Sequence, residues 1–325
     1  MRVLVTGGAG FIGAHLVDEL MERGYEVTVY DNLSWGREEF LREHFGKENF
    51  KFVRGDLLDP QALKEAVRGQ DFVHHLAANP DIRRGPEQPD LDLKQNVFAT
   101  FNLLEAMRSE GVRSLSFSSS STVYGEARAL PTPEDYGPLL PISLYGASKL
   151  AAEALISAYC HTFGFRAWIF RFANIVGPRQ THGVIVDFLE KLRRNWRELE
   201  VIGDGNQTKD YLYISDAVDA TMLVLKRGRL EGEAYNVGSG ESLTVREIVE
   251  MILEAVGLKG LTGVVYTGKS WAGDVPVTLA DVSRLRRIGF EPKVHVREGL
   301  GMFIEWYEGN YGKVGRDATF GWTTI

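Results

Sequence analysis

Residues 3–13 read VLVTGGAGFIG, a short apolar strand followed by Gly7, Gly10 and Gly13 at a regular spacing. Apolar residues then recur at helical spacing through residues 14–23. A strand, a glycine turn and a helix in this order are typical of dinucleotide binding, because glycines let the backbone approach a pyrophosphate at the positive end of the helix. The spacing differs from the common G-x-G-x-x-G, and a glycine-rich turn without a ligand is the alternative interpretation.

A second apolar strand is expected at residues 26–30, and it ends in Asp31. A carboxylate at this position accepts hydrogen bonds from both adenosine ribose hydroxyls and repels a 2′-phosphate. Asp31 therefore favours NAD over NADP as the cofactor.

Strands and helices alternate through the first half of the chain, which predicts a doubly wound parallel sheet with helices on both faces. In such sheets ligands bind at the carboxyl ends of the strands. Asp31, Asp56, Ala77, Ala78 and residues 118–121 are all expected there and would line one crevice. The further strands are expected at residues 50–54, 71–76, 114–118 and 166–172, and the helices at 60–68, 92–110 and 143–163.

A tyrosine and a lysine, Tyr145 and Lys149, lie four positions apart in a segment that reads as a helix, so they share one face. An ammonium this close favours the phenolate, and a phenol of lowered pKa can take a proton from an alcohol. Alone, the pair also fits an exposed helix face. Four serines at residues 118–121 precede Val123-Tyr124-Gly125 and are the first sign of a reactive site.

Composition limits the classes of protein that fit. The chain has 325 residues and a net charge of −7, which argues against a nucleic-acid or membrane-surface protein. The single cysteine, Cys160, cannot form an internal disulfide. No apolar run approaches 18 residues and the first strand starts at residue 3, so we expect no signal peptide, no membrane span and a cytoplasmic location. His74 and His75 lack metal-ligand spacing, so we expect core histidines and no metal site.

Ordered motifs extend over nearly the whole chain: TGGAGFIG, DNLS, GDL, HLAA, FSSSSTVYG, YGASK, RFANIVGPR, DYLYISDAV and YNVGSG. Through them the chain resembles the extended short-chain dehydrogenase/reductases, and within these the nucleotide-sugar 4-epimerases of the UDP-glucose (UDP-galactose) 4-epimerase type. The resemblance implies an NAD-binding Rossmann domain over residues 1–173, onto which residues 212–240 pack back. It also implies a smaller α/β domain over 174–325 that binds a UDP-sugar, and a homodimer formed through helices near 92–110 and 143–163.

The resemblance also implies roles for the reactive residues. Tyr145 takes the proton of the sugar O4, Ser120 hydrogen-bonds O4, and Lys149 holds the nicotinamide ribose and lowers the pKa of Tyr145; Ser121 or Thr122 could share the hydroxyl role. The family's cofactor contacts, carried onto matching positions, are Gly7, Gly10, Phe11, Ile12, Gly13, Asp31, Asn32, Ser34, Gly36, Asp56, Leu57, Leu76, Ala77, Ala78, Asn96, Ser118, Tyr145, Lys149 and Phe172.

The two residues directly before the Val-Tyr-Gly motif distinguish the reactions of the related enzymes. The family's 4,6-dehydratases carry an Asp-Glu pair there, and its decarboxylases carry a glutamate, because chemistry at C5 and C6 needs a further acid or base. This chain has Ser121 and Thr122 instead. The resemblance therefore indicates epimerisation.

The substrate contacts implied by the resemblance are Ser120, Tyr145, Asn174, His182, Val184, Lys209, Trp271, Asp274 and Thr278. Lys209 and Trp271 replace arginines common in the family, and lysine cannot form the two parallel hydrogen bonds that arginine gives to a phosphate. The alternative phosphate contacts are Arg83, Arg84 and Arg179, which also read as surface charges.

The identity of the sugar stays open. UDP-glucose and UDP-galactose are the expected substrates, but Thr278 stands where a tyrosine often limits the sugar site, which leaves room for an N-acetyl group. The alternatives are a UDP-N-acetylhexosamine or UDP-glucuronate 4-epimerase and, in another class, a catalytically silent NAD-binding scaffold. Residues 312–325 show no periodicity and are expected to pack as a surface tail.

Overall fold

The computed structural model describes residues 1–228 and 233–316. Its centre is a seven-stranded parallel sheet in the order β10-β6-β5-β4-β1-β2-β3. The strands are β1 (Arg2–Thr6), β2 (Glu26–Asp31), β3 (Phe50–Arg54), β4 (Phe72–His75), β5 (Ser114–Ser120), β6 (Arg166–Phe172) and β10 (Glu233–Val237). Every strand expected in the first half of the chain is present, and the expected fold class is confirmed.

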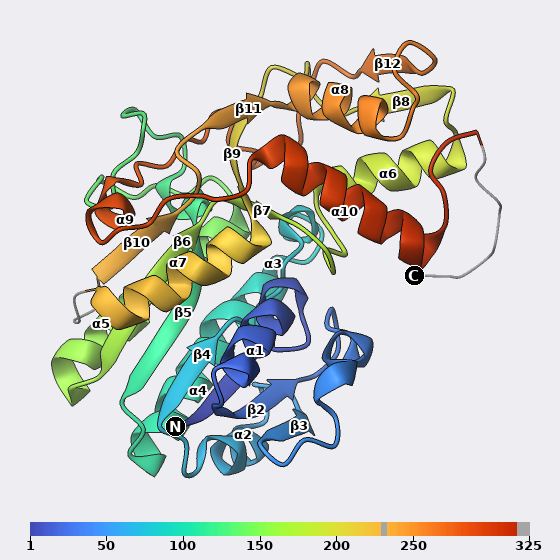
Figure 1. The fold of residues 1–325 in the computed structure, drawn as a ribbon. Coiled ribbons are helices and arrows are strands. Elements are labelled where there is room, and N and C mark those ends of the chain that lie inside the picture. Colours follow the sequence, from blue (N-terminus) through green and yellow to red (C-terminus); the bar gives the residue numbers. More distant parts are fainter. Residues whose placement is uncertain (229–232, 317–325) are drawn as a thin grey trace.

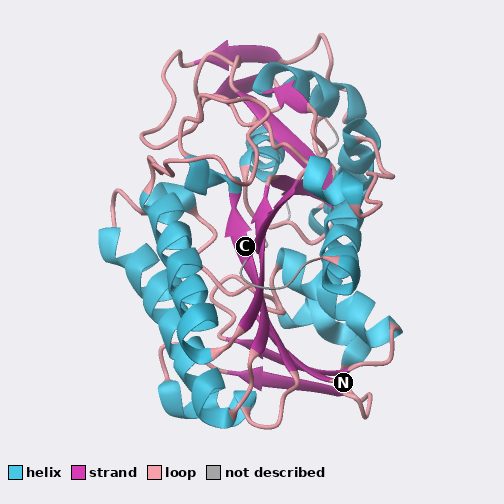
Figure 2. Cartoon of the chain, turned by 90° about the vertical axis from the view of Figure 1, so that its left-hand side faces the viewer, coloured by secondary structure: helices cyan, strands magenta, loops and turns pink. Residues whose placement is uncertain are grey.

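Helices cover both faces of this sheet, as the edge-on view in Figure 2 shows. One face packs α1 (Phe11–Glu22) and α7 (Ile214–Arg227), and the other packs α2 (Pro60–Val67), α4 (Ala99–Glu110) and α5 (Leu144–Phe163). Successive β1 residues divide between the two cores, since Val3 and Val5 belong to the first and Leu4 to the second. Both faces of the sheet are therefore buried.

The helix expected over residues 92–110 is present but is not a regular α-helix in its first part. The chain forms a short helix α3 (Pro89–Asp92), then a π-helical turn (Leu93–Phe98), and only then the regular helix α4. A π-helical turn shifts the backbone register, and such turns occur often at functional sites. Asn96, which lies in this turn, is thereby buried toward α5, where its amide donates to the Ser148 hydroxyl at 2.7 Å.

Most elements after β6 lie above the sheet in Figure 1, whereas α7 and β10 return to it. The strands above the large sheet form two small sheets, β11-β9-β7 and β12-β8. The strands are β7 (Asn174–Val176), β8 (Glu198–Val201), β9 (Thr208–Tyr213), β11 (Ser242–Thr244) and β12 (Gly263–Tyr266). The helices are α6 (Val184–Arg194), α8 (Val245–Ala255), α9 (Ser283–Arg287) and α10 (Val296–Tyr311).

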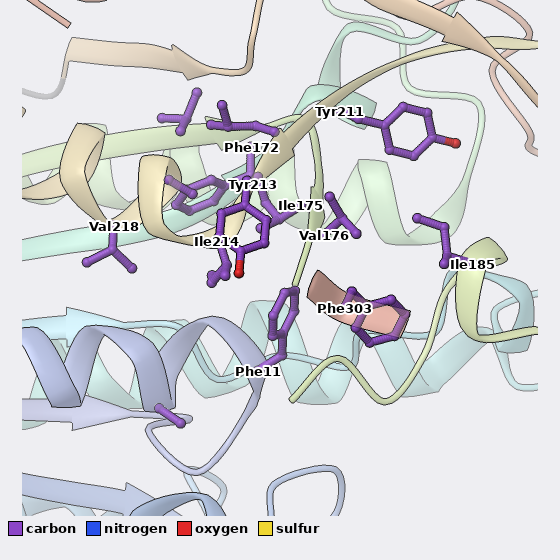
Figure 3. Close-up of a cluster of buried hydrophobic side chains, with 14 of the residues drawn as sticks. Phe11, Phe172, Ile175, Val176, Ile185, Tyr211, Tyr213, Ile214, Val218 and Phe303 are labelled. Atoms are coloured by element: carbon purple, nitrogen blue, oxygen red, sulfur yellow. The ribbon is translucent and has the colours of Figure 1, made fainter. Parts of the chain in front are cut away.

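A shared core joins this second part to the first helix. Figure 3 shows Phe11, at the start of α1, among side chains from β7, β9, α6 and α10. Phe172, at the end of β6, is drawn in the same cluster and is buried. Burial of apolar surface across this junction fixes the C-terminal elements over the carboxyl ends of the large sheet. Of the expected tail, Val314 is buried in this core, and residues 317–325 lie outside the described part.

Within residues 1–228 and 233–316, no helix is both long and apolar enough to cross a bilayer.

Candidate active site

The glycine turn between β1 and α1 has no room for side chains. Gly7 has a φ of +70°, and a Cβ there would lie 2.6 Å from the backbone nitrogen of Ala77. A Cβ on Gly13 would lie 2.2 Å from the carbonyl oxygen of Gly7. Both glycines are therefore required by close backbone approach. The first turn of α1 follows directly at Phe11, and its free N–H groups suit a pyrophosphate.

A pocket of about 210 Å³ opens at the carboxyl ends of β1, β2, β4 and β5. Seventeen of the nineteen expected cofactor contacts line it: Gly7, Gly10, Phe11, Ile12, Gly13, Asp31, Asn32, Ser34, Gly36, Asp56, Leu57, Leu76, Ala77, Ala78, Ser118, Tyr145 and Lys149. The other two, Asn96 and Phe172, are not among its lining residues; Asn96 hydrogen-bonds Asn79 and the α5 residue Ser148, and Phe172 lies in the shared core. The glycine cradle and the carboxylate beside it fit a dinucleotide.

Six lining residues were missed by the sequence reasoning: Tyr30, Trp35, Gly55, Pro80, Gln95 and Thr181. Only Gly55 carried a usable signal, because it stands beside Asp56 at a strand end; a Cβ there would lie 2.4 Å from the Tyr30 ring. Trp35 stands edge-on to His182 at 5.9 Å between ring centres, a contact between residues far apart in the chain. Local sequence could not have indicated it.

Asp31 is buried at the end of β2 and is held by the loops around it. Its carboxylate accepts hydrogen bonds from the backbone N–H groups of Ala9 at 3.0 Å and Leu33 at 2.8 Å. Burial raises the pKa of Asp31, and these two hydrogen bonds oppose that effect. The carboxylate thus faces the pocket in a fixed orientation, as a ribose contact requires.

Tyr145 and Lys149 lie in the first turns of α5, which begins at the N-cap Ser143. The Lys149 Nζ donates to the Ser118 carbonyl oxygen at 2.7 Å and lies 5.7 Å from the centre of the Tyr145 ring. Ser120 hydrogen-bonds the Tyr145 hydroxyl, and its own Oγ accepts from Thr122 Oγ1 at 3.0 Å. Tyr145 and Lys149 thus line the pocket, and Ser120, which is not among its lining residues, is joined to it through the Tyr145 hydroxyl.

The expected lowering of the Tyr145 pKa is wrong for the protein alone. Burial raises the pKa of Tyr145, the Asp92 carboxylate raises it further, and the Ser120 hydrogen bond only partly offsets both. Burial also lowers the pKa of Lys149 to about 7, against the opposing effects of Asp92 and Glu153. In the protein itself, the effect of desolvation on the Tyr145 pKa therefore outweighs the lowering expected from a lysine one helical turn away.

Two expected substrate contacts bind each other. Lys209 Nζ lies 2.8 Å from Asp274 Oδ1 and also donates to the Val275 carbonyl. Ser270 Oγ donates to the other Asp274 oxygen at 2.6 Å. The sequence reasoning expected Lys209 at a phosphate and Asp274 at a ribose, and did not foresee this pair.

Of the remaining expected substrate contacts, His182 is among the lining residues of the pocket, whereas Asn174, Val184, Trp271 and Thr278 are not. Asn174 is exposed at the start of β7, with its amide on the Asp210 carbonyl oxygen at 3.1 Å, and Val184 begins α6. Trp271 is partly buried. His182 lines the pocket with a buried Nδ1 that has no hydrogen-bond partner. Thr278, whose buried Oγ1 also has none, lines a small neighbouring cavity with Ser121.

The three alternative arginines make contacts of their own. Arg179 pairs with Asp18 at 2.6 Å, Arg84 lies over the Trp35 ring at 6.0 Å, and Arg83 is 3.8 Å from Asp81. None of the three is among the residues that line the pocket.

The two neighbouring histidines of β4 are core residues, as expected. His74 bonds the Ser116 hydroxyl at 2.7 Å, and His75 bonds the hydroxyls of Thr6 and Thr100. Burial lowers the pKa of each to about 3, so both are neutral at ordinary pH. Among the residues that the structure describes, no cluster of His, Cys, Asp and Glu could hold a metal ion.

Comparison with known proteins identifies the family. A model described as the NAD dependent epimerase/dehydratase family matches residues 3–238. The chain is 41% identical to a UDP-galactose 4-epimerase of known crystal structure, with a TM-score of 0.85, over 95% of this chain and 99% of that one. It is 36% identical to a protein solved with UDP-glucuronic acid and NAD, with a TM-score of 0.83, over 95% and 100% of the two chains.

A UDP-glucose 4-epimerase of Mycolicibacterium smegmatis is 35% identical over 94% of this chain and 98% of its own length. These similarities confirm the resemblance drawn from the motifs, the Rossmann-type fold and NAD as the cofactor. The chain belongs to the NAD-dependent epimerase/dehydratase family.

Proposed function

We propose that this enzyme interconverts UDP-glucose and UDP-galactose by inverting the configuration at C4 of the sugar. The observation that carries the proposal is that Tyr145 and Lys149 line the NAD pocket and Ser120 hydrogen-bonds Tyr145, with Ser121 and Thr122 where a carboxylate is needed for dehydration. Relatives that are 35% and 41% identical carry the names of UDP-glucose and UDP-galactose 4-epimerases.

Each residue has a distinct task in this proposal. Tyr145 accepts the proton of the 4-hydroxyl and later returns it, while Ser120, hydrogen-bonded to Tyr145, orients the hydroxyl and relays the proton. Lys149 holds a positive charge near the Tyr145 ring and is fixed by the Ser118 carbonyl. When bound, NAD accepts the C4 hydride and gives it back. Between these events the 4-keto sugar rotates about its link to the diphosphate and presents its other face.

The diphosphate and nucleoside are assigned to the C-terminal elements. The Lys209–Asp274 pair is only 16% and 11% exposed at its side chains, so its charges are weakly screened and well placed for a phosphate and a ribose hydroxyl. Asn174, His182, Val184, Trp271 and Thr278 complete the proposed substrate contacts, which fall in the 174–325 domain, beside the NAD-binding domain of residues 1–173.

A homodimer is part of the proposal. Leu93, Phe98 and Phe101 are each more than two-fifths exposed along the π-helical turn and α4, beside α5. Apolar side chains gathered on neighbouring helices support an interface between two copies of this chain. Size-exclusion chromatography with light scattering tests this part separately.

A second substrate class is supported by Thr278. Its side chain lines a small cavity next to Ser121, with no hydrogen-bond partner for its buried hydroxyl. An N-acetyl group at the edge of this cavity could bond this hydroxyl. UDP-N-acetylhexosamines are therefore the second candidate substrates.

The test is a panel of UDP-galactose, UDP-N-acetylgalactosamine and UDP-glucuronate, with the products separated chromatographically. We expect UDP-galactose to give UDP-glucose at the highest kcat/KM. Faster turnover of another sugar would move the assignment to that sugar. The absence of any turnover by protein that carries NAD would instead favour a catalytically silent NAD-binding scaffold.

Tyr145→Phe provides the matched variant, because it removes only the hydroxyl. We expect kcat to fall at least about 100-fold while NAD stays bound. Tyr25→Phe, at the turn between α1 and β2, serves as the control and should keep full activity.

A further inference from the structure

Asp92 is a buried carboxylate that the proposed reaction does not yet use. It lies at the end of α3, just before the π-helical turn, and is 1% exposed. One oxygen accepts from the Asn79 amide at 2.9 Å and from the Asn96 amide at 3.4 Å. The other oxygen, Oδ2, is buried without a hydrogen-bond partner. A buried carboxylate oxygen without a partner is costly, so its retention calls for a reason.

In the part of the chain that the structure describes, no lysine or arginine side chain near Asp92 pairs with its free oxygen. Among residues 1–228 and 233–316, Asp92 forms no ion pair. The other carboxylate that acts on Lys149, Glu153, is already neutralised, because Arg171 contacts both of its oxygens at 3.0 and 2.7 Å. The charge of Asp92 is therefore the one near Lys149 that no arginine compensates.

Hydrogen bonds connect Asp92 to the helix that carries the reactive pair. The Asn96 amide that contacts Asp92 also donates to the Ser148 hydroxyl at 2.7 Å, and this hydroxyl donates to the Tyr145 carbonyl at 2.7 Å. Gly85 lies between the free oxygen and the start of α5. A Cβ on Gly85 would lie 3.1 Å from Asp92 Oδ2 and 3.3 Å from the Cβ of Leu144, the first residue of α5. The free oxygen therefore lies near the start of α5, the end of the helix that carries a partial positive charge.

We propose that Asp92 is a positioning residue for the Tyr145–Lys149 pair, and that its buried negative charge keeps Lys149 protonated beside Tyr145. The inference deepens the proposed function, because it assumes that Tyr145 and Lys149 carry the proton transfer. Asp92 itself touches neither substrate nor cofactor in this assignment; it acts through Lys149.

Electrostatics set the direction of the effect. Asp92 raises the pKa of Lys149, which opposes the larger lowering caused by burial. It also raises the pKa of Tyr145, in the same direction as the larger effect of burial. The other charged or titratable groups around the pair are Glu153, neutralised by Arg171, Asp81, which acts on Asp92, and the neutral His75. Loss of the Asp92 charge should therefore ease the loss of one proton from the pair as a whole.

Asp92→Asn isolates the charge. The asparagine Oδ1 can still accept from the amides of Asn79 and Asn96, so the hydrogen-bond network is kept while the negative charge is lost. Asp90→Asn is the matched control: it lies two residues away, is exposed, and pairs with Lys94 on the helix surface. If Asp92→Asn does not fold, as judged by its thermal transition, Asp92→Ser is measured in the same way.

Two readouts test the proposal. The first is the acid side of the pH profile of kcat/KM, which should move to lower pH by about one unit in Asp92→Asn and stay in place in Asp90→Asn. The second is the pH dependence of acetylation of Lys149 by trace acetic anhydride in the protein as purified, read by peptide mass spectrometry. Lys149 lines the pocket, and the midpoint of its labelling should move the same way.

The second readout needs no turnover, so the two proposals can fail separately. A wild-type enzyme without epimerase activity would refute the proposed function, yet the labelling midpoint would still decide the role of Asp92. An unchanged labelling midpoint and an unchanged profile in Asp92→Asn would overturn the role assigned to Asp92. A fall in rate at every pH without a shift would likewise reduce Asp92 to a structural residue.

Discussion

Lys149 Nζ lies 5.7 Å from the centre of the Tyr145 ring and donates a hydrogen bond of 2.7 Å to the carbonyl oxygen of Ser118. The ammonium is thus fixed to the end of β5 rather than bonded to the phenol hydroxyl. That hydroxyl is bonded by Ser120, two residues further along the same strand. The strand end therefore positions both partners of Tyr145.

Replacement of the ammonium should reduce the rate more than the affinity. In Lys149→Met we expect kcat to fall by about 100-fold or more, because Tyr145 then has no positive charge beside it. Steady-state kinetics with UDP-galactose measures this. Lys149→Arg keeps the charge but not the geometry, so its kcat should lie between those of the wild type and of Lys149→Met. A kcat of Lys149→Met within threefold of wild type would contradict the role.

The Trp35–His182 contact should slow the release of NAD. Both rings line the pocket, and the loop that carries Trp35 is fixed to the glycine turn by a hydrogen bond from Arg37 N to Ala9 O at 2.9 Å. An aromatic pair contributes about 0.5–1.5 kcal/mol, so Trp35→Ala should release NAD about threefold to tenfold faster. Release is followed after dilution into an NAD-consuming trap. Trp35→Phe should behave like wild type, and equal rates for all three proteins would rule the contact out.

The Lys209–Asp274 pair should affect substrate affinity and leave the cofactor alone. Asp274→Asn removes the charge that holds Lys209 Nζ at 2.8 Å, and we expect KM for the UDP-sugar to rise about tenfold at a similar kcat. NAD content per chain, measured after gel filtration, should not change. Ser270→Ala, which removes only the hydrogen bond to Asp274, is the milder control. A lowered NAD content would place the pair elsewhere in the mechanism.

The buried Glu153–Arg171 pair should stabilise the fold. Both side chains are 7% exposed, and Ser119 also donates to Glu153. Glu153→Gln leaves the guanidinium without a counter-charge, so the free energy of unfolding should fall by about 3–5 kcal/mol in urea titrations. Glu254→Gln breaks an exposed pair with Arg297 and should leave the unfolding midpoint unchanged. Equal midpoints for the two variants would argue against a structural role for the buried pair.

The neutral His74 should make stability dependent on pH. Its pKa is about 3 in the folded protein against 6.5 unfolded, so the unfolded chain binds the extra proton and stability is lost as pH falls below 6.5. The loss is about 1.4 kcal/mol per pH unit for this group between those values. His74→Asn can keep the bond to Ser116 and should show a shallower slope of unfolding free energy between pH 6.5 and 4.5. Parallel slopes would show that His74 does not titrate on unfolding.

Much of the fold was predictable because its signals are local. The glycines at 7, 10 and 13 and the apolar strands before Asp31, Asp56, Ala77 and Ser118 each follow from neighbouring residues, and parallel strands bring those ends together. The helix at 92–110 was only partly predicted. Its π-helical turn places the Asn96 side chain against α5 and the loop at Asn79, which lie elsewhere in the sequence.

The sequence by itself determined the parallel α/β fold and the NAD pocket, since periodicity and turn residues act over a few positions, and the family motifs indicated that Tyr145, Lys149 and Ser120 act together. Only the tertiary structure decided the proton balance of that pair, the mutual binding of Lys209 and Asp274, and the contact between Trp35 and His182. Burial and charge act through space. A pKa therefore depends on which side chains exclude water around a group, and folding brings those side chains from distant parts of the chain.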